Sequence, residues 1–304
     1  MGQDVSVKRA SCADVLDIRS RVVVETEDKR VGYSWPLKPF DRAHPVRGFF
    51  NDPRISGASR AFHFGVDISA PNGAPVYAVA AGQVHLEDAR AISVAAGDVD
   101  FGYWHVVPAV RHRELVARHQ LLGHVETPWL HVHFAERRGG VYRNPLRPAG
   151  LTPWTDATKP MITSVGFFRD GHAVPASAVS GAVDVVAEAH DTPPVAVPAP
   201  WHGLPVTPAL LRWRVLRRGT VVRRWHAPVN FKTALLPKER FDAIYAPGTR
   251  QNHADKPGVY RFFLAHTWST DRLPNDDYAL EVEASDLAGN IGSHRLPFRL
   301  ANGL

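Results

Sequence analysis

Two pairs of residues in the first half of this chain have the types and the spacing of metal ligands. His63 and Asp67 stand four residues apart, and His131 and His133 are separated by a single residue. Imidazole nitrogens and carboxylate oxygens bind Zn²⁺, and a catalytic zinc site uses three such ligands and keeps a further position open. The sequence therefore predicts a zinc site that is assembled from both pairs.

The local structure expected around these residues brings them together. Side chains alternate along a β-strand, so a strand over His131–His133 points both imidazoles to one face, within about 7 Å of each other. Gly65 allows the backbone to bend, so that Asp67 can fold back toward His63. His63, Asp67 and one of the two later histidines then give a three-ligand site, and the spacing leaves open which of the two it is.

The chemistry of such a site is hydrolysis by an activated water molecule. Zn²⁺ lowers the pKa of water from about 15.7 to about 7 and polarises a peptide carbonyl. A neighbouring imidazole accepts the proton, because its own pKa is near neutrality. A fourth histidine is available on another expected strand, in Tyr103-Trp104-His105.

The segment that must position these residues, from Arg60 to Glu136, has the pattern of short β-strands separated by Gly and Pro. The strands expected here are Phe62–Phe64, Pro75–Ala80, Gly82–Glu87, Ile92–Ala95, Phe101–Val107, Gln120–Val125 and Leu130–Ala135. A short helix is expected at Arg111–Ala117. The pattern favours an antiparallel sheet with one buried face and one face that forms a groove.

The second half of the chain has strand patterns of its own. They cover Met161–Phe168, Ala182–His190, Leu210–Arg218, Thr220–Trp225, Gly258–Thr267, Asp277–Ala284 and Ser293–Leu300. In Tyr278–Ala284 every second residue is apolar and faces one way. Seven strands at this spacing predict an immunoglobulin-like or fibronectin-like β-sandwich. Phe241–Lys256 is a long polar loop for such a domain, and we expect it to be a functional elaboration.

The whole chain is therefore expected to be all-β, with four parts. Residues 1–32 form a lead-in, with a short helix or strand in Cys12–Val24; residues 33–138 form the metal-binding domain. Residues 139–160, rich in Gly and Pro, form a linker, and residues 161–304 form the β-sandwich.

Composition narrows the class of protein. Of 304 residues 44% are hydrophobic, which is typical of a globular protein. A single cysteine, Cys12, excludes an intramolecular disulfide framework and a Cys-rich metal site. The net charge of +6, carried by 29 Arg and 7 Lys, favours anionic partners. No block of five basic residues, no run of 18 apolar residues and no signal peptide is visible, so we expect no nucleic-acid arm and no membrane insertion.

The ordered motifs resemble those of the lysostaphin-type zinc endopeptidases of bacterial cell walls, also called the LytM or β-lytic group. That pattern is H-x-x-x-D, then Y-x-H, then H-x-H, and here it matches the segments 63–67, 103–105 and 131–133. The family's Ala-Pro-x-Gly-x-Pro-Val-x-Ala stretch is present at Ala70–Ala78. The resemblance covers Arg47 to Glu136, less than a third of the chain.

The resemblance implies a role for each residue. His63, Asp67 and His133 would bind one Zn²⁺ per chain, His131 would be the general base, and His105 would orient groups or stabilise the oxyanion. Two departures concern substrate preference: His119 replaces a glycine of the family, and the approach to H-x-H lacks the common Ser/Thr-Gly-Pro-His stretch. Three further histidines, His112, His119 and His124, are interpreted as structural or solvent-exposed.

The leading hypothesis is a zinc-dependent endopeptidase that cuts peptide cross-links of peptidoglycan. Its partners would be peptidoglycan or a peptide, with no nucleic acid. Its location would be extracytoplasmic (periplasm, cell wall or secreted), with the export signal absent from this chain, although a cytoplasmic location is also compatible with the sequence.

Two alternatives to this hypothesis remain open. One is a non-hydrolytic cell-wall binding or regulatory protein that keeps the peptidase fold. The other is a sandwich that binds glycan or protein, with candidate stacking residues at Trp201, Trp213, Trp225 and Trp268.

Overall fold

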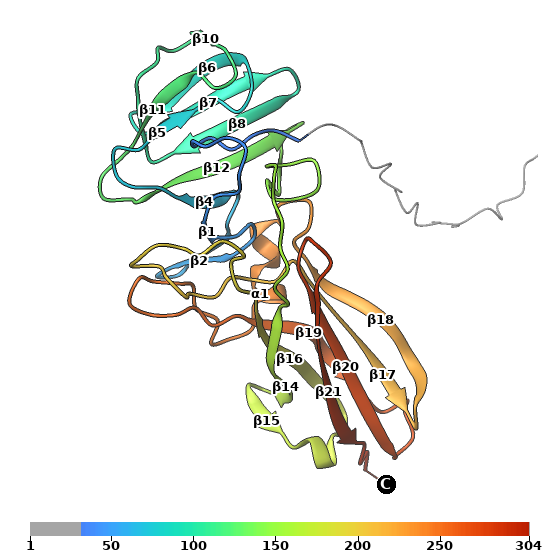
Figure 1. Ribbon diagram of the computed structural model, residues 1–304. Coiled ribbons are helices and arrows are strands. Elements are labelled where there is room, and N and C mark those ends of the chain that lie inside the picture. Colours follow the sequence, from blue (N-terminus) through green and yellow to red (C-terminus); the bar gives the residue numbers. More distant parts are fainter. Residues whose placement is uncertain (1–31, 304) are drawn as a thin grey trace, which may run out of the picture. The chain divides into compact units, whose positions relative to one another are not determined.

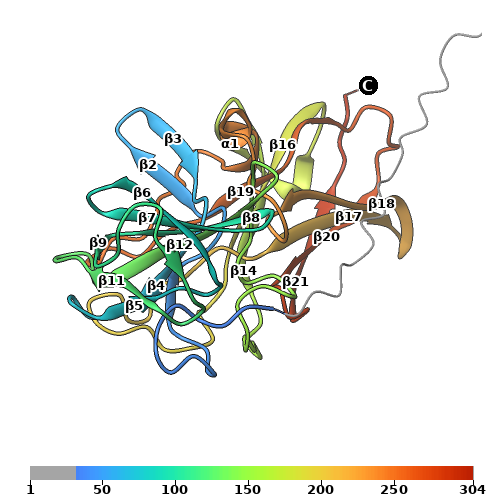
Figure 2. The same cartoon turned by 90° about the horizontal axis from the view of Figure 1, so that it is seen from above.

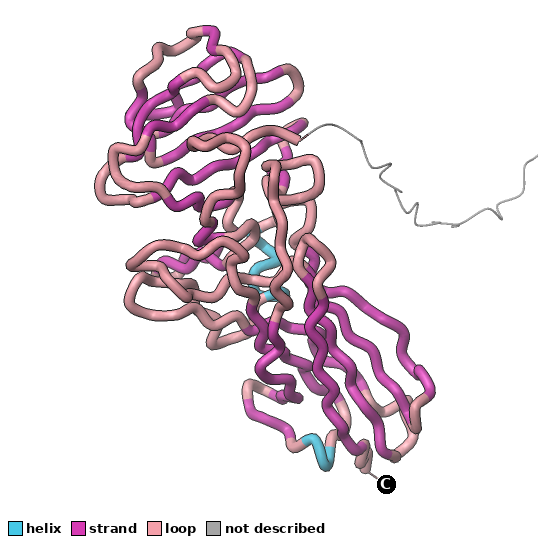
Figure 3. The backbone as a smooth tube through the Cα atoms, viewed as in Figure 1, coloured by secondary structure: helices cyan, strands magenta, loops and turns pink. Residues whose placement is uncertain are grey.

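The computed structural model describes residues 32–303. Strands make up most of its regular structure, as Figure 3 shows, and the prediction of an all-β chain is confirmed. The helix or strand expected in Cys12–Val24 lies outside the described residues. No helix of the described residues is long and apolar enough to cross a membrane.

The strands that carry the candidate site form an antiparallel sheet in the order β1-β4-β12-β8-β7-β6-β10, with β13 paired to the end of β12 (Figure 1). Their bounds, in that order, are Val46–Gly48, Val66–Ser69, His131–Arg138, Val99–Trp104, Ala91–Ala96, Gly82–Asp88, Leu115–Val116 and Val141–Arg143. A smaller sheet has the order β5 (Pro75–Tyr77), β11 (Leu121–Val125) and β9 (Val106–Pro108). Strands β2 (Pro53–Ser56) and β3 (Ser59–Phe62) form a separate hairpin, visible in Figure 2.

Most of the expected strands of this region are present, but three predictions need correction. The strand expected at Phe62–Phe64 is wrong, because β3 ends at Phe62 and the two residues after it lie outside any strand. The segment 101–107 is interrupted at His105, whose φ of 63° ends β8 and separates it from β9. The helix expected at Arg111–Ala117 is wrong: Leu115–Val116 is strand β10, paired with β6. Arg113 has a φ of 67°, in the left-handed region, which a right-handed helix cannot accommodate. Glu114 instead closes a turn by accepting a hydrogen bond from the Arg111 backbone N–H at 2.8 Å.

Strand β12 lies in the middle of the large sheet and is buried along most of its length. Its alternation separates two environments. Val132 and Phe134 belong to the apolar core, together with Val66 and Ile68 of β4. The intervening histidines face the other side of the sheet. The core therefore fixes the register that presents them.

The remaining strands form two antiparallel four-stranded sheets. One has the order β15 (His172–Val174), β14 (Met161–Arg169), β16 (Ala182–His190) and β19 (Arg261–Ser269). The other has the order β18 (Thr220–Asn230), β17 (Leu210–Arg217), β20 (Asp277–Ser285) and β21 (Ile291–Arg299). The expected alternation of β20 is confirmed, because Tyr278, Leu280, Val282 and Ala284 are all buried in one core cluster. The immunoglobulin-like character of this region and the four-part division of the chain stay predictions.

Loops of this C-terminal region contact the chain just before His63. The ring of Phe62 packs against Phe241, in the short helix α1 (Phe241–Ile244), and against Tyr245. The Gln251 side chain accepts a hydrogen bond from the Ile55 backbone N–H at 2.6 Å. Short 3₁₀ turns η1 (Ala176–Ala178) and η2 (Lys238–Arg240) complete the helical structure of the described residues. The segment predicted to be a functional elaboration is thus joined to the hairpin that leads into the candidate site.

Candidate metal centre

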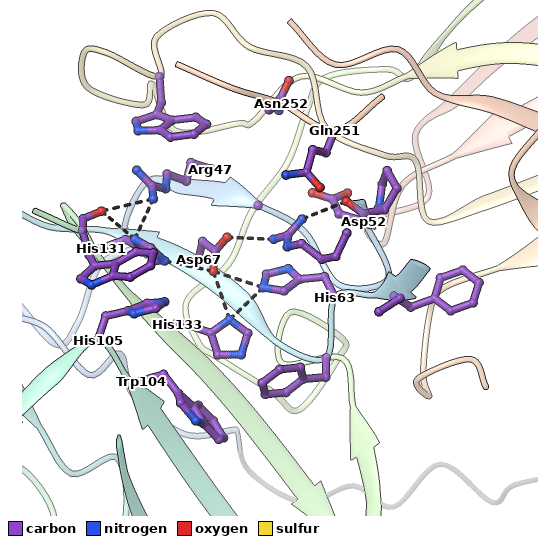
Figure 4. A pocket seen from close by; sticks show the side chains of 18 of the residues that line it. Arg47, Asp52, His63, Asp67, Trp104, His105, His131, His133, Gln251 and Asn252 are labelled. Carbon is purple, nitrogen blue, oxygen red and sulfur yellow. Dashed lines mark hydrogen bonds and ion pairs between the residues drawn. The ribbon is translucent and has the colours of Figure 1, made fainter. Parts of the chain in front are cut away.

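Three donor atoms from separate positions in the chain converge at one point (Figure 4). Nε2 of His63 lies 2.8 Å from Nδ1 of His133, and Oδ1 of Asp67 lies 3.1 Å from each of these nitrogens. Adjacent strands produce this geometry, because Asp67 of β4 is directly opposite His133 of β12. Two ligands bound to Zn²⁺ at about 2.0–2.1 Å in tetrahedral geometry are about 3.3 Å apart. His63, Asp67 and His133 therefore form a group that can hold a metal ion.

The hydrogen bond at the far side of His63 sets its tautomer. Nδ1 lies 2.8 Å from the Phe49 carbonyl oxygen, which only accepts, so Nδ1 carries the proton and Nε2 presents a lone pair. Burial, followed by the Arg54 charge, lowers the pKa of His63 to about 3. Burial also lowers the pKa of His133, whose Nε2 has no hydrogen-bond partner among residues 32–303. Both rings are therefore neutral, as metal ligands must be.

Asp67 contributes the negative charge of the group. Its Oδ2 accepts a hydrogen bond from the Arg54 guanidinium at 2.9 Å, which leaves Oδ1 directed at the two histidines. Burial by itself raises the pKa of Asp67, but His63, His131 and Arg54 outweigh it and hold the pKa well below its usual range. A carboxylate and two neutral imidazoles favour zinc over the hard cations that select oxygen alone.

Two glycines are needed for this close packing. A Cβ atom on Gly65 would lie 2.3 Å from the Phe134 carbonyl oxygen and 2.7 Å from Nε2 of His133. A Cβ on Gly48 would lie 2.5 Å from Oδ2 of Asp67. Gly65 does not have a positive φ, so its role is to admit close approach of the next strand rather than to allow a bend, which corrects the reason expected from the sequence.

His131 projects from the same face of β12 as His133, as the alternation predicts. Its Nε2 lies 3.4 Å from Oδ1 of Asp67. Its Nδ1 is 2.7 Å from the Trp129 carbonyl oxygen and 2.7 Å from a guanidinium nitrogen of Arg47. One nitrogen cannot donate to the first and accept from the second. With the proton on Nδ1, the ring donates a hydrogen bond to the Trp129 carbonyl oxygen, and Nε2 is free to act as a base. With the proton on Nε2, Nδ1 accepts a hydrogen bond from Arg47 and Nε2 is a donor.

His105 lies at the edge of the same group. Its ring stacks on Trp129, with centroids 3.8 Å apart, and its centroid is 4.6 Å from that of His131. Burial, followed by the nearby His131, lowers the pKa of His105 to about 4. A neutral imidazole at this position can donate one N–H to a substrate oxygen.

The group opens into a cavity of about 640 Å³. Its walls include residues far from the motif segments, among them Arg47, Trp129, Trp201, Gln251 and Asn252. The Arg47 guanidinium lies over the Trp201 ring at 4.1 Å. Sequence reasoning missed Arg47 and Arg54 as site residues. The segment Phe241–Lys256, expected to be a polar loop, begins with helix α1 and supplies Gln251 and Asn252.

The four tryptophans singled out in the sequence have different environments. Trp201 lines the cavity. Trp213 and Trp268 are buried in the core, and Trp225 lies beneath the guanidinium groups of Arg212 and Arg214.

The other histidines lie elsewhere in the described chain. His119 contacts the Ser34 hydroxyl at 2.7 Å and stacks on Phe40, while His112 contacts the Leu86 backbone N–H. Neither they nor His124 line the cavity formed by the described residues. The Asn51 side chain, close in sequence to the site, bonds to the backbone of Ala234 and Leu236.

No protein-family model matches the chain, and no curated protein matches its sequence. Among solved structures it is similar to Csd3 of Helicobacter pylori, at 18% identity over 41% of this chain and 36% of that chain, with a TM-score of 0.34. A zinc-containing peptidase from Vibrio cholerae is 22% identical over 35% of this chain and 36% of that chain, with a TM-score of 0.30. The catalytic domain of the antimicrobial peptidase lysostaphin from Staphylococcus simulans is 22% identical over 30% of this chain and 78% of that domain, with a TM-score of 0.27. The chain thus spans about a third of the length of the first two proteins.

Proposed function

We propose that this protein is a zinc-dependent endopeptidase that hydrolyses peptide bonds in peptidoglycan cross-links. The observation that carries the proposal is the convergence of one carboxylate oxygen and two imidazole nitrogens, all within 3.1 Å of one another, beside an open cavity that His105 and His131 also line. Three ligands with an accessible position are the arrangement of catalytic zinc, whereas structural zinc has four protein ligands.

The proposed chemistry assigns separate tasks to the four histidines. His63, Asp67 and His133 would hold the ion, which when bound supplies Lewis-acid activation of water and of the peptide carbonyl. His131 would accept the proton of the attacking water at Nε2 and later give it to the leaving amine. This requires the tautomer in which Nδ1 donates to the Trp129 carbonyl oxygen, 2.7 Å away. His105 would donate an N–H to the carbonyl oxygen as negative charge develops there.

The cavity walls support a peptide as the substrate. Trp104, Trp129 and Trp201 offer flat apolar surfaces, and Arg47 and Gln251 offer hydrogen-bond donors between them. Bonds of this kind fix an extended chain across a groove without demanding large side chains, which suits short cross-links. The net charge of +6 suits an anionic wall polymer, and the proposed location is extracytoplasmic.

The deciding experiment combines metal analysis with cell-wall turbidity. We expect one zinc per chain, clearing of wall suspensions, loss of clearing with a chelator and recovery when zinc is added back. Mass spectrometry of the released fragments identifies the bond that is cut.

A protein that binds zinc but does not hydrolyse cell walls would contradict the proposal. Zinc at one per chain, with no clearing of any wall type and no cleavage of a panel of cross-link peptides, would favour the alternative of a non-hydrolytic wall-binding protein. Sedimentation of the protein with intact walls would then measure that binding directly.

A further inference from the structure

A second group of acidic residues converges outside the proposed zinc site. Asp156 lies in the segment between β13 and β14, Asp191 follows β16 directly, and Asp286 follows β20 directly. One oxygen from each lies within 4.8 Å of the others. All three line a cavity of about 20 Å³, which is large enough for one water molecule or one ion but for little more.

The hydrogen bonds of these carboxylates leave one buried oxygen without a partner. Asp286 is bonded through both oxygens to Asn290 and also to the Gly289 backbone N–H. Asp156 accepts two hydrogen bonds from Thr158, both at Oδ1. Asp191 accepts one, from the Thr192 backbone N–H at Oδ1, and its Oδ2 is buried with no partner in the described part of the chain. Asp191 is only 1% exposed, so water outside the cavity does not solvate this oxygen.

The charges of the group are also uncompensated. No ion pair among the described residues involves any of the three aspartates, and no Lys, Arg or His is among the described residues that line the cavity. Burial, followed by the charges of Asp156 and Asp286, raises the pKa of Asp191 to about 7. Buried carboxylates are ordinarily paired with a cation or coordinate a metal. A missing cation would account for both the orphan oxygen and the unbalanced charge.

The donor set selects the kind of ion. Carboxylate oxygens alone suit hard cations, whereas Zn²⁺ and the later transition metals prefer nitrogen or sulfur. Ca²⁺ binds oxygen at about 2.3–2.6 Å, and three carboxylate oxygens that lie within 4.8 Å of one another can share one such ion. Mg²⁺ requires shorter bonds and retains several water molecules, for which a 20 Å³ cavity has no room.

We propose that Asp156, Asp191 and Asp286 form a structural Ca²⁺ site that fastens the segment between β13 and β14 to the loops after β16 and β20. A weaker neutral link is already present, since the Asn290 side chain donates to the Asp156 carbonyl oxygen at 2.9 Å. An ion at this point would join the same segments through charge. It would stabilise the folded chain, because the three carboxylates come together only after folding.

The test is thermal unfolding of the full-length protein, with zinc retained, titrated with CaCl₂ and in parallel with MgCl₂ at pH 8. Asp191→Asn removes one ligand charge, and Asp277→Asn is the matched control, because Asp277 begins β20 and its side chain is 75% exposed. At 100 times the Kd, Ca²⁺ should raise the Tm of the wild type and of the control by about 5 °C. Ca²⁺ should leave the Tm of Asp191→Asn unchanged. Without Ca²⁺, the Tm of this variant should equal or exceed that of the wild type, because repulsion between the carboxylates has been relieved.

A second measurement reads the site without unfolding. Trp154 lines the cavity, so Tb³⁺, which replaces Ca²⁺, should give tryptophan-sensitised luminescence that saturates at one ion per chain and is lost in Asp191→Asn. The proposal is overturned if Ca²⁺ shifts the Tm of neither protein. It is equally overturned if Ca²⁺ shifts the wild type and Asp191→Asn by the same amount, which would place the ion elsewhere.

Discussion

Two groups of side chains that could hold a metal ion differ in donor chemistry and in access. His63, Asp67 and His133 present two nitrogens and one oxygen beside a cavity of about 640 Å³. The aspartates at 156, 191 and 286 present oxygen alone to a cavity of about 20 Å³. Donor type selects the metal, and access decides whether a substrate can reach it. The first group is therefore suited to catalysis and the second to holding chain segments together.

The two groups also treat a buried carboxylate in opposite ways. Arg54 lies 2.9 Å from Asp67 and, with the neighbouring histidines, outweighs the effect of burial, so the pKa of Asp67 falls well below its usual range. Asp191 has no such cation, and burial with two further carboxylates raises its pKa to about 7. A preassembled counter-charge keeps the first group ionised without metal, whereas the second group depends on an ion to become ionised.

The largest effect that separates the groups is expected from His133→Ala. Removing Nδ1 takes one ligand from the three-ligand group, so zinc should be lost and peptide cleavage should fall to the uncatalysed background. Zinc per chain by elemental analysis and cleavage of a cross-link peptide measure this. Asp191→Asn should leave both unchanged, and a loss of zinc in that variant would contradict the separation of the two groups.

The next effect concerns His131→Ala, which tests the division of labour inside the first group. Zinc should stay at one per chain, because its three ligands are untouched, while kcat should fall by about 10²–10⁴-fold through loss of the general base. His124→Ala, on an exposed strand position away from the cavity, is the control. If His131→Ala releases zinc, then His131 is a ligand and the assigned roles are wrong.

A smaller effect is expected at the counter-charge itself. Arg54→Gln keeps a donor near Asp67 but removes the positive charge, and a change of this kind next to a metal ligand reduces metal affinity or activity by about 10–100-fold. Competition with a zinc-binding dye measures the affinity. Arg60→Gln is matched, because Arg60 lies on the same hairpin and, within residues 32–303, donates only to the nearby Gly57 and Ser59 carbonyl oxygens. Equal zinc affinity in both variants would show that Arg54 does not support Asp67.

Local patterns predicted the part of the site that depends on a single strand or a short turn. The alternation of a strand is enough to place His131 and His133 on one face. The alternation of β20 was readable for the same reason. The four-residue spacing indicated that His63 and Asp67 meet, although the reason expected for it, a bend at Gly65, was wrong. The reading failed at Arg111–Ala117, where a left-handed residue, Arg113, interrupts a sequence that has helix-forming composition.

Contacts between segments distant in the sequence could not be predicted in this way. Arg47 and Trp201 meet over the cavity although more than a hundred residues separate them, and neither belongs to a motif. The three aspartates come from three separate connections, so no spacing marks them as a group. Such sites depend on how the loops pack against one another, and loop packing produces no periodic pattern in the sequence.

The smallest effect is a dependence of stability on pH that belongs to the second group. An unfolded Asp191 ionises near its usual pKa of 3.8, but in the folded protein its pKa is about 7. The folded state therefore binds the extra proton, and the resulting stability is fully present below pH 4 and is lost as pH rises through 7. Between pH 6 and pH 8 the free energy of unfolding of the Ca²⁺-free protein should fall by about 1.4 kcal/mol through this residue, since each pKa unit is worth that amount.

Denaturant unfolding of the wild type and of Asp191→Asn at both pH values isolates the contribution of Asp191, because every other titrating group is common to the two proteins. Saturating Ca²⁺ should reverse the trend in the wild type, since the ion binds the ionised carboxylate and competes with the proton. The prediction is contradicted if the difference in free energy of unfolding between wild type and Asp191→Asn is the same at pH 6 and pH 8 without Ca²⁺. Asp191 would then already be ionised without Ca²⁺, and the two groups would hold their carboxylates in the same state.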